Sequence, residues 1–165
     1  MDATPGARAG DRDDGSGTRR MANSTAAGAA DAGPRIAALQ LDVVRRLAVR
    51  TYPEWTGEDA DRAEREYRDF LYVCWYSWRH ASTTQLAAMC RRADQMWHCH
   101  MLLPHRYGAD CEGVFGAGHI LDHDPFFAEG DWPPRRKQAA DAYRAAGRDF
   151  PSDDLIANCQ YSIVA

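Results

Sequence analysis

The chain has 165 residues, of which 45% are hydrophobic and 27% charged, and its formal net charge is −4. A negative balance argues against a general nucleic-acid-binding protein, because phosphate contacts need a clustered positive surface. No apolar stretch approaches the roughly 18 residues that a membrane span needs, and five cysteines, an odd number, in a chain without a recognisable export signal predict reduced thiols in a cytoplasmic protein.

The first 33 residues contain no aromatic side chain and are rich in Gly, Ala, Asp and Arg. Such a segment cannot bury enough apolar surface to offset the entropy of ordering it, so we expect a disordered tail over residues 1–33. The remainder, about 130 residues, has the usual size of one domain. We expect a helical domain over residues 34–152 and a C-terminal tail over residues 153–165.

Two amphipathic helices are predicted at the start of this domain. Apolar residues spaced three and four apart after Pro34 indicate the first helix. They are Ile36, Leu39, Val43, Val44 and Leu47. Thr56 is a plausible N-cap for the second helix, which runs to about His80 and has Tyr67 and Phe70 on its inner face.

Three further helices follow in the predicted order. The capping box Ser82-Thr-Thr-Gln85 opens the first of them, which ends before Pro104. The next runs from Pro104 to Phe115, and the last covers roughly residues 134–147. Residues 119–125 are expected to form a loop or one extended turn, and the end of the chain from Tyr161 a short extended strand. The fold class is therefore all-α, a compact bundle of about five helices.

Chemistry-bearing side chains crowd into one window of the sequence. Five of the six histidines lie between His98 and His123, together with Cys99, Cys111 and several aspartates. Imidazole, thiolate and carboxylate are the groups that bind transition metals or transfer protons, so this window is the candidate functional site.

Helix geometry sorts these residues. Asp94 and His98 are four residues apart and share one face of the third predicted helix, whereas His100 lies on another face. A second histidine ligand must come from further along the chain, and His123 is the best candidate because a loop after two glycines can fold back over the helix. Other candidates are Cys111, Asp124 and His119.

A set made of Asp94, His98 and His123 has the composition of the two-histidine, one-carboxylate site that binds iron(II), whereas the thiolate of Cys111 in place of the carboxylate would favour zinc. The leading hypothesis is an enzyme with one divalent metal, iron or zinc, that acts on a small-molecule substrate by oxidation or hydrolysis. In this enzyme His100 would be an acid/base group or a hydrogen-bond donor to one of the metal ligands. Trp97 and Tyr107 form the walls of the pocket.

Other interpretations stay open. A His98 ring bonded to Asp94 needs no metal, and the same residues would then form a buried polar network in a non-catalytic helical interaction module. A cysteine nucleophile, Cys99 or Cys111, with His123 as its base lacks a local signature. Redox sensing through either thiol is a third alternative.

The run Asp94-x-x-Trp97-His98-x-His100-Met101-Leu102-x-Pro104-x-x-Tyr107-x-x-Asp110-Cys111, followed by Leu121-Asp122-His123-Asp124-Pro125, resembles the signature of the glycine-rich domain-containing protein-like family. The resemblance covers about 35 residues strongly, and the glycine-rich tract of the plant members is absent. It implies a small helical domain with recurrent polar residues but no defined reaction. These residues are Asp94, His98, His100, Cys111 and His123.

Overall fold

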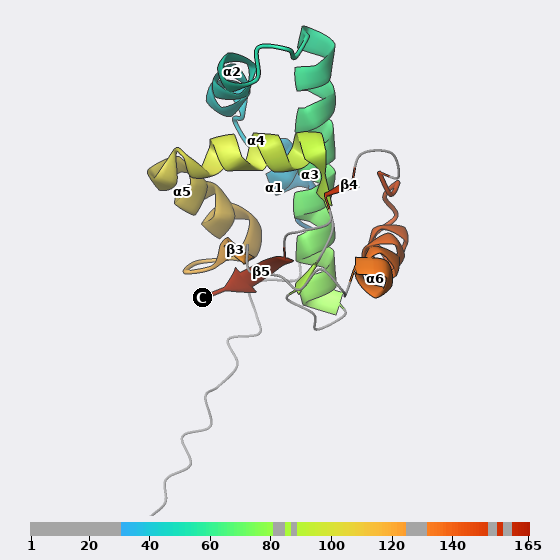
Figure 1. The fold of residues 1–165 in the computed structure, drawn as a ribbon. Helices are drawn as coiled ribbons and strands as arrows, with labels where there is room; N and C mark the ends of the chain where they lie inside the picture. Colours follow the sequence, from blue (N-terminus) through green and yellow to red (C-terminus); the bar gives the residue numbers. More distant parts are fainter. Residues whose placement is uncertain (1–30, 81–84, 87–88, 125–131, 152–154, 157–159) are drawn as a thin grey trace, which may run out of the picture.

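The structure is a computed structural model that describes residues 31–80, 85–86, 89–124, 132–151, 155–156 and 160–165. Its helices are α1 (Gly33–Ala37), α2 (Asp42–Thr51), α3 (Gly57–His80), α4 (Arg91–Met101), α5 (Pro104–Phe115) and α6 (Trp132–Ala145). Its strands are β1 (Gln85–Leu86), β2 (Met89–Cys90), β3 (Ile120–Asp124), β4 (Leu155–Ile156) and β5 (Gln160–Val164). The predicted all-α class is confirmed, with the short strands β3 and β5 near one end of α3 and β4 beside its middle (Figure 1).

The long helix α3 forms the axis of the molecule, and α4 crosses it (Figure 1). The buried side of α3 is continuous, because an apolar or aromatic residue recurs every three or four positions along the helix. Tyr67, Phe70 and Val73 on α3 are fully buried, as are Met96 and Trp97 on α4. This contact between α3 and α4 is the centre of the core.

The start of α3 follows the sequence prediction. The Thr56 hydroxyl accepts the backbone N–H of Asp59 at 3.1 Å, and the Asp59 carboxylate accepts the backbone N–H of Thr56 at 3.0 Å. This reciprocal pair is a capping box, which satisfies two of the donors that a helix start leaves free. Thr56 is therefore the N-cap, as predicted.

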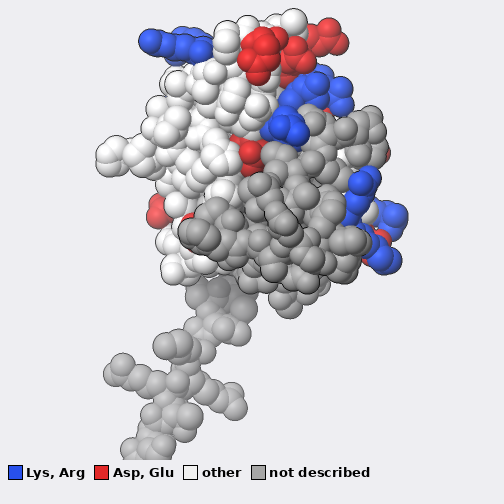
Figure 2. All heavy atoms as spheres, in the orientation of Figure 1, with Lys and Arg blue, Asp and Glu red and all other residues white. Residues whose placement is uncertain are grey.

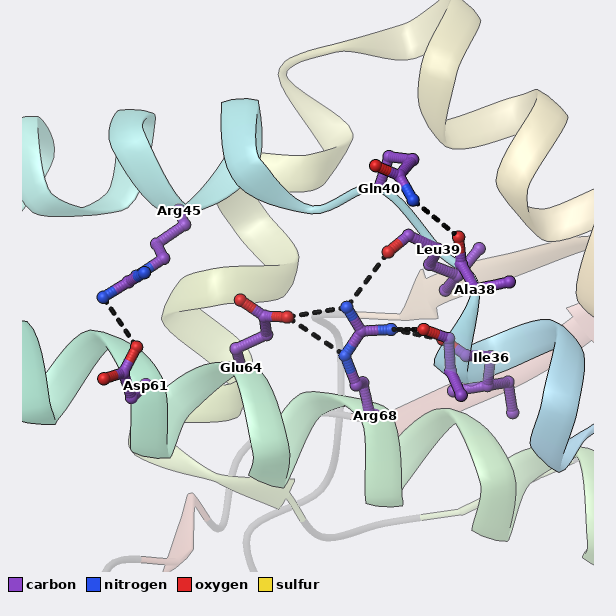
Figure 3. A network of polar contacts seen from close by, with 9 residues as sticks. Ile36, Ala38, Leu39, Gln40, Arg45, Asp61, Glu64 and Arg68 are labelled. Carbon is purple, nitrogen blue, oxygen red and sulfur yellow. Dashed lines mark hydrogen bonds and ion pairs between the residues drawn. The ribbon is translucent and has the colours of Figure 1, made fainter.

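The first predicted helix is wrong as one element, because it is divided into α1 and α2. Arg68 of α3 explains the break, since its guanidinium donates to the backbone carbonyls of Ile36 and of Leu39, the latter at 3.0 Å, and pairs with Glu64 at 2.6 Å (Figure 3). These carbonyls lie where α1 ends and the chain turns into α2. A charged donor from α3 therefore replaces the helical hydrogen bonds that a continuous helix would have made.

The third predicted helix begins later than expected. Residues 81–84, which hold most of the predicted capping box, lie outside the described residues. Where a helix was expected, β1 pairs with β5 and β2 pairs with β4, both antiparallel. Cys90 precedes α4 with an extended backbone, φ −72° and ψ 153°. The prediction was wrong because strand partners from the end of the chain override a local capping signal.

The loop predicted over residues 119–125 is also wrong in its described part. Ile120–Asp124 form β3, which pairs antiparallel with β5, so that Leu121 lies opposite Ile163 and His123 opposite Tyr161. The strand order in this sheet is β1-β5-β3. The extended strand expected near Tyr161 is confirmed as β5, the central strand of the sheet.

The remaining elements are close to expectation. Helix α5 has the predicted bounds, and α6 begins two residues earlier than the predicted segment. The N-terminal tail lies outside the described residues up to residue 30, and α1 already begins at Gly33. Among the described helices, none is both long enough and apolar enough to cross a membrane.

Candidate functional site

His100 lies in the core between α3 and α5. Its side chain is buried, its Nδ1 is 3.0 Å from the Tyr67 hydroxyl and its Nε2 is 3.1 Å from Asp110 Oδ2. A carboxylate only accepts, so Nε2–H donates to Asp110 and Nδ1 accepts the Tyr67 O–H. Burial lowers the pKa of His100 below its usual value, although Asp110 acts in the opposite direction. The neutral ring therefore has both nitrogens bonded to the protein.

This position corrects the role predicted for His100. An acid/base group must reach the proton that it transfers, and His100 is 1% exposed with both nitrogens occupied. Its partner Asp110 is partly exposed and lies 3.8 Å from Arg106 Nε. The three side chains Tyr67, His100 and Asp110 form a structural chain that ties α3, α4 and α5 together.

A second buried chain of hydrogen bonds involves Trp97 and Tyr107. The Trp97 indole N–H donates to the Tyr107 hydroxyl at 2.9 Å, and that hydroxyl donates to the backbone carbonyl of Leu121 on β3. Trp97 and Tyr107 are 0% and 5% exposed. Both side chains thus lie beneath the surface and fix the packing of α4, α5 and β3, rather than forming the walls of an open pocket.

Cys111 belongs to this buried chain. Its thiol hydrogen-bonds with the Tyr107 hydroxyl and with the backbone of Leu121. Burial raises the pKa of the Cys111 thiol, so the thiol is protonated at neutral pH. Metal binding and nucleophilic attack both require the thiolate. The predictions of Cys111 as a zinc ligand and as a nucleophile therefore have no support from its surroundings.

Asp94 and His98 form the pair that helix geometry predicts. His98 Nδ1 donates to the Asp94 backbone carbonyl at 2.8 Å and lies 3.2 Å from Asp94 Oδ2. The hydrogen bond to the Asp94 carboxylate raises the pKa of His98, although partial burial opposes it. The His98 side chain is 41% exposed. Its Nε2 has no hydrogen-bond partner among the described residues, so this nitrogen is open to a ligand.

His123 approaches this pair from β3. The ring centroids of His98 and His123 are 5.4 Å apart, with the two planes at 84°. The Trp97 indole packs edge-on against both rings, at 5.2 Å from His98 and 5.0 Å from His123. Two imidazoles 25 positions apart in the sequence therefore meet beside Trp97, with the Asp94 carboxylate next to His98.

The histidine window is thus divided in space. Asp94, His98 and His123 come together, whereas His100 and Cys111 belong to the buried chains. His119 packs against Trp78, with centroids 4.8 Å apart. Among the residues that the structure describes, no three His, Cys, Asp or Glu side chains are arranged so that they would hold a metal ion as they stand. The side chain of Asp124 lies outside the described set.

Two residues that matter here were missed as site residues from the sequence. The sequence pattern predicts for Tyr67 only a place on the inner face of its helix, and it predicts no role for Asp110. The signal for Asp110 was its place six residues after Pro104, on the face of α5 toward α4. No local signal joins Tyr67 to a histidine 33 positions later.

A small hollow lies near Asp94 along α4. It has a volume of about 240 Å³ and is lined by Glu54, Trp55, Asp59, Arg91, Arg92 and Gln95. The Tyr52 ring stacks on Trp55 of this lining, with ring centroids 5.2 Å apart, and burial raises the pKa of Tyr52. Acidic and basic side chains also gather next to each other where α3 begins (Figure 2).

Comparison with known proteins adds no relative, because no protein-family model, no curated protein and no solved structure matches the chain. The function is therefore inferred from the residues of the site themselves.

Proposed function

We propose that the protein is a metal-dependent enzyme that binds a divalent ion between His98 and His123 and acts on a small molecule. The observation that carries this proposal is the approach of the two imidazoles, with centroids 5.4 Å apart, at a position where His98 is 41% exposed. Two imidazoles so close, one of them partly exposed and beside a carboxylate, are donor types that bind iron(II) and zinc.

The hydrogen bonds around His98 fit a ligand role. With Nδ1–H donated to Asp94, the neutral ring carries its lone pair on Nε2, which is the form that binds metals. A carboxylate or carbonyl on the second nitrogen is the usual partner of a ligating histidine, because it fixes the tautomer and the ring orientation. Asp94 thus orients His98, and the donors to the ion are the two imidazoles.

The chemistry follows from the donor set. An ion held by two imidazoles retains positions for water and substrate, and it supplies Lewis-acid or redox chemistry at neutral pH. Because Cys111 lies in the buried chain, the donor set contains no thiolate, and oxidation at iron(II) and hydrolysis at zinc are the two reactions that fit. The Asp94 carboxylate adds negative charge that favours a cation.

The hollow on α4 is where we place the substrate. Arg91, Gln95 and His98 are spaced by four and three residues, so they lie along one face of α4. Three residues separate Gln95 from His98, a rise of about 4.5 Å along the helix. The hollow, about 240 Å³, is smaller than the roughly 300–1,000 Å³ of sites for drug-sized ligands, and its charged lining suits a small polar molecule.

Metal titration tests the proposal. Purified protein, stripped with chelator and titrated with zinc, cobalt(II) or, without oxygen, iron(II), should bind one equivalent. His98→Ala and His123→Ala should each weaken binding by more than the roughly 10-fold to 100-fold that loss of an orienting partner costs, and Asp94→Asn by about that amount. His105→Ala, in an exposed histidine of the same window, is the matched control and should change nothing.

Two results would overturn the proposal of a metal site between His98 and His123. Wild-type protein that binds no ion in any of the three titrations has no metal site. Binding that survives His98→Ala and His123→Ala would belong to some other part of the chain.

A non-catalytic helical interaction module is the second candidate. The buried chains Tyr67–His100–Asp110 and Trp97–Tyr107–Leu121 favour it, because they give several residues of the window a structural role without any chemistry. In this case the protein would carry no metal, and His98→Ala would change only its melting temperature. The same titrations and a thermal melt of the variant distinguish the two functions.

A further inference from the structure

A single buried hydroxyl connects the two elements that carry the proposed metal ligands. Tyr107 on α5 accepts the indole N–H of Trp97 on α4 at 2.9 Å and donates to the backbone carbonyl of Leu121 on β3. The Tyr107 side chain is 5% exposed, and burial raises the pKa of its hydroxyl far above the usual value. The hydroxyl is therefore a neutral group that both donates and accepts.

Each end of this connection lies next to one histidine. Trp97 directly precedes His98 on α4, and its ring contacts both imidazoles. Leu121 is two residues before His123, and residues two apart in a strand project from the same face. The Leu121 side chain is buried at 1% exposure. The bond from the Tyr107 hydroxyl to the Leu121 carbonyl thus fixes the distance between β3 and Trp97, and with it the position of the His123 ring.

Besides its bond with Tyr107, β3 has Leu121 buried in the core and pairs with β5. A strand paired on one side can shift as a unit with its neighbour, so the pairing alone does not set the distance from β3 to α4. The contacts that cross this gap include the hydroxyl bridge of Tyr107 and the packing of the Trp97 and His98 rings against His123.

We infer that Tyr107 is a positioning residue, which sets the spacing of His98 and His123 for a metal ion. The inference rests on the proposed function, and it adds a residue that does not touch the ion. Metal–ligand distances must hold to within about 0.2 Å, so a small displacement of β3 is enough to weaken binding. Loss of the hydroxyl leaves both the Leu121 carbonyl and the Trp97 N–H without their buried partner, which favours such a displacement.

Two conservative variants provide the test. Tyr107→Phe removes the bridge, and Tyr67→Phe removes another buried tyrosine hydroxyl, the one bonded to His100, which has no bond to β3. Both variants should melt at lower temperature than the wild type. Only Tyr107→Phe should weaken zinc binding, by about 10-fold to 100-fold, whereas the zinc affinity of Tyr67→Phe should stay within about threefold of the wild type.

The outcomes separate the two claims. If the wild type binds zinc and both variants bind it equally well, or both lose the same affinity, Tyr107 is only a packing residue and the inference is wrong. If the wild type binds no metal, the proposed function fails first. Should Tyr107→Phe not fold in buffer, all three proteins are titrated in an osmolyte such as trimethylamine N-oxide, which strengthens folding without changing the comparison.

Discussion

Replacing Tyr67 by Phe is the sharpest test of the buried chain around His100. The change removes one oxygen and leaves the ring, so the packing on α3 is kept. The hydrogen bond to His100 Nδ1 is lost, and that nitrogen, inside a side chain that is 1% exposed, has no water to replace its partner. A lost hydrogen bond costs about 0.5–1.5 kcal/mol, and a buried acceptor left unsatisfied about 1–3 kcal/mol.

Since these two figures describe overlapping parts of one loss, we expect a decrease of about 2 kcal/mol in the free energy of unfolding. For a chain of this size, that corresponds to a melting temperature lower by about 4–8 °C. Urea unfolding at pH 7.5 in the presence of chelator, followed by tryptophan fluorescence, measures the change without a contribution from metal. A double-mutant cycle with His100→Leu should give a coupling of about 1–2 kcal/mol.

A decrease below about 0.5 kcal/mol would refute the argument, because it would place the Tyr67 hydroxyl among groups that water can reach. Near-zero coupling with His100→Leu would do the same even if Tyr67→Phe were destabilising, since the cost would then come from elsewhere in the core.

Three further changes test other parts of the fold. Burial lowers the pKa of His100 below its ordinary value of 6.5, so the unfolded chain takes up a proton first and the free energy of unfolding should fall as the pH drops below 6.5. When both proteins are unfolded in urea between pH 5 and 7.5, the free energy of unfolding should depend less on pH in His100→Gln than in the wild type. An equal dependence in the two proteins would contradict the lowered pKa of His100. Thr56→Ala should cost about 0.5–2 kcal/mol in thermal unfolding, because α3 loses its N-cap, whereas Thr56→Ser should lose little. Arg68→Met should cost about 2 kcal/mol and open the turn between α1 and α2 to limited proteolysis, because two backbone carbonyls lose a charged donor. Arg68→Lys should not restore the turn, because the single nitrogen of an ammonium cannot take the places of the two guanidinium nitrogens that bond Ile36 and Leu39. A protease-resistant turn in both variants would show that the guanidinium is dispensable.

Much of the helical framework was predictable because its signals are local. Pro104 and Gly116 delimit α5, and Thr56 begins α3. The same holds for Asp94 and His98, whose contact follows from a spacing of four residues in a helix. The prediction that His100 lies on another face is confirmed too, since it contacts Tyr67 and Asp110 instead.

Apart from β5, the strands were not predictable, because the segments that pair with them lie far along the chain. β1 and β2 have two residues each, too few for an alternating pattern, and their partners are at residues 155–164. The break between α1 and α2 depends in the same way on Arg68, a residue of α3. The burial of Trp97 and Tyr107 depends on how the whole core packs. The sequence does not distinguish an aromatic side chain that lines an open pocket from one that is buried beneath the surface.

The central place of β5 has a consequence for how the protein is made. β1 and β3 lie on opposite sides of β5, so neither has its partner in this sheet until the residues up to Val164 have been synthesised. At about 5–20 residues per second, a nascent chain spends several seconds with His98 already in its helix and His123 still without a neighbouring strand. The candidate site therefore takes its final form only after β5 has emerged, well after its own residues have been synthesised.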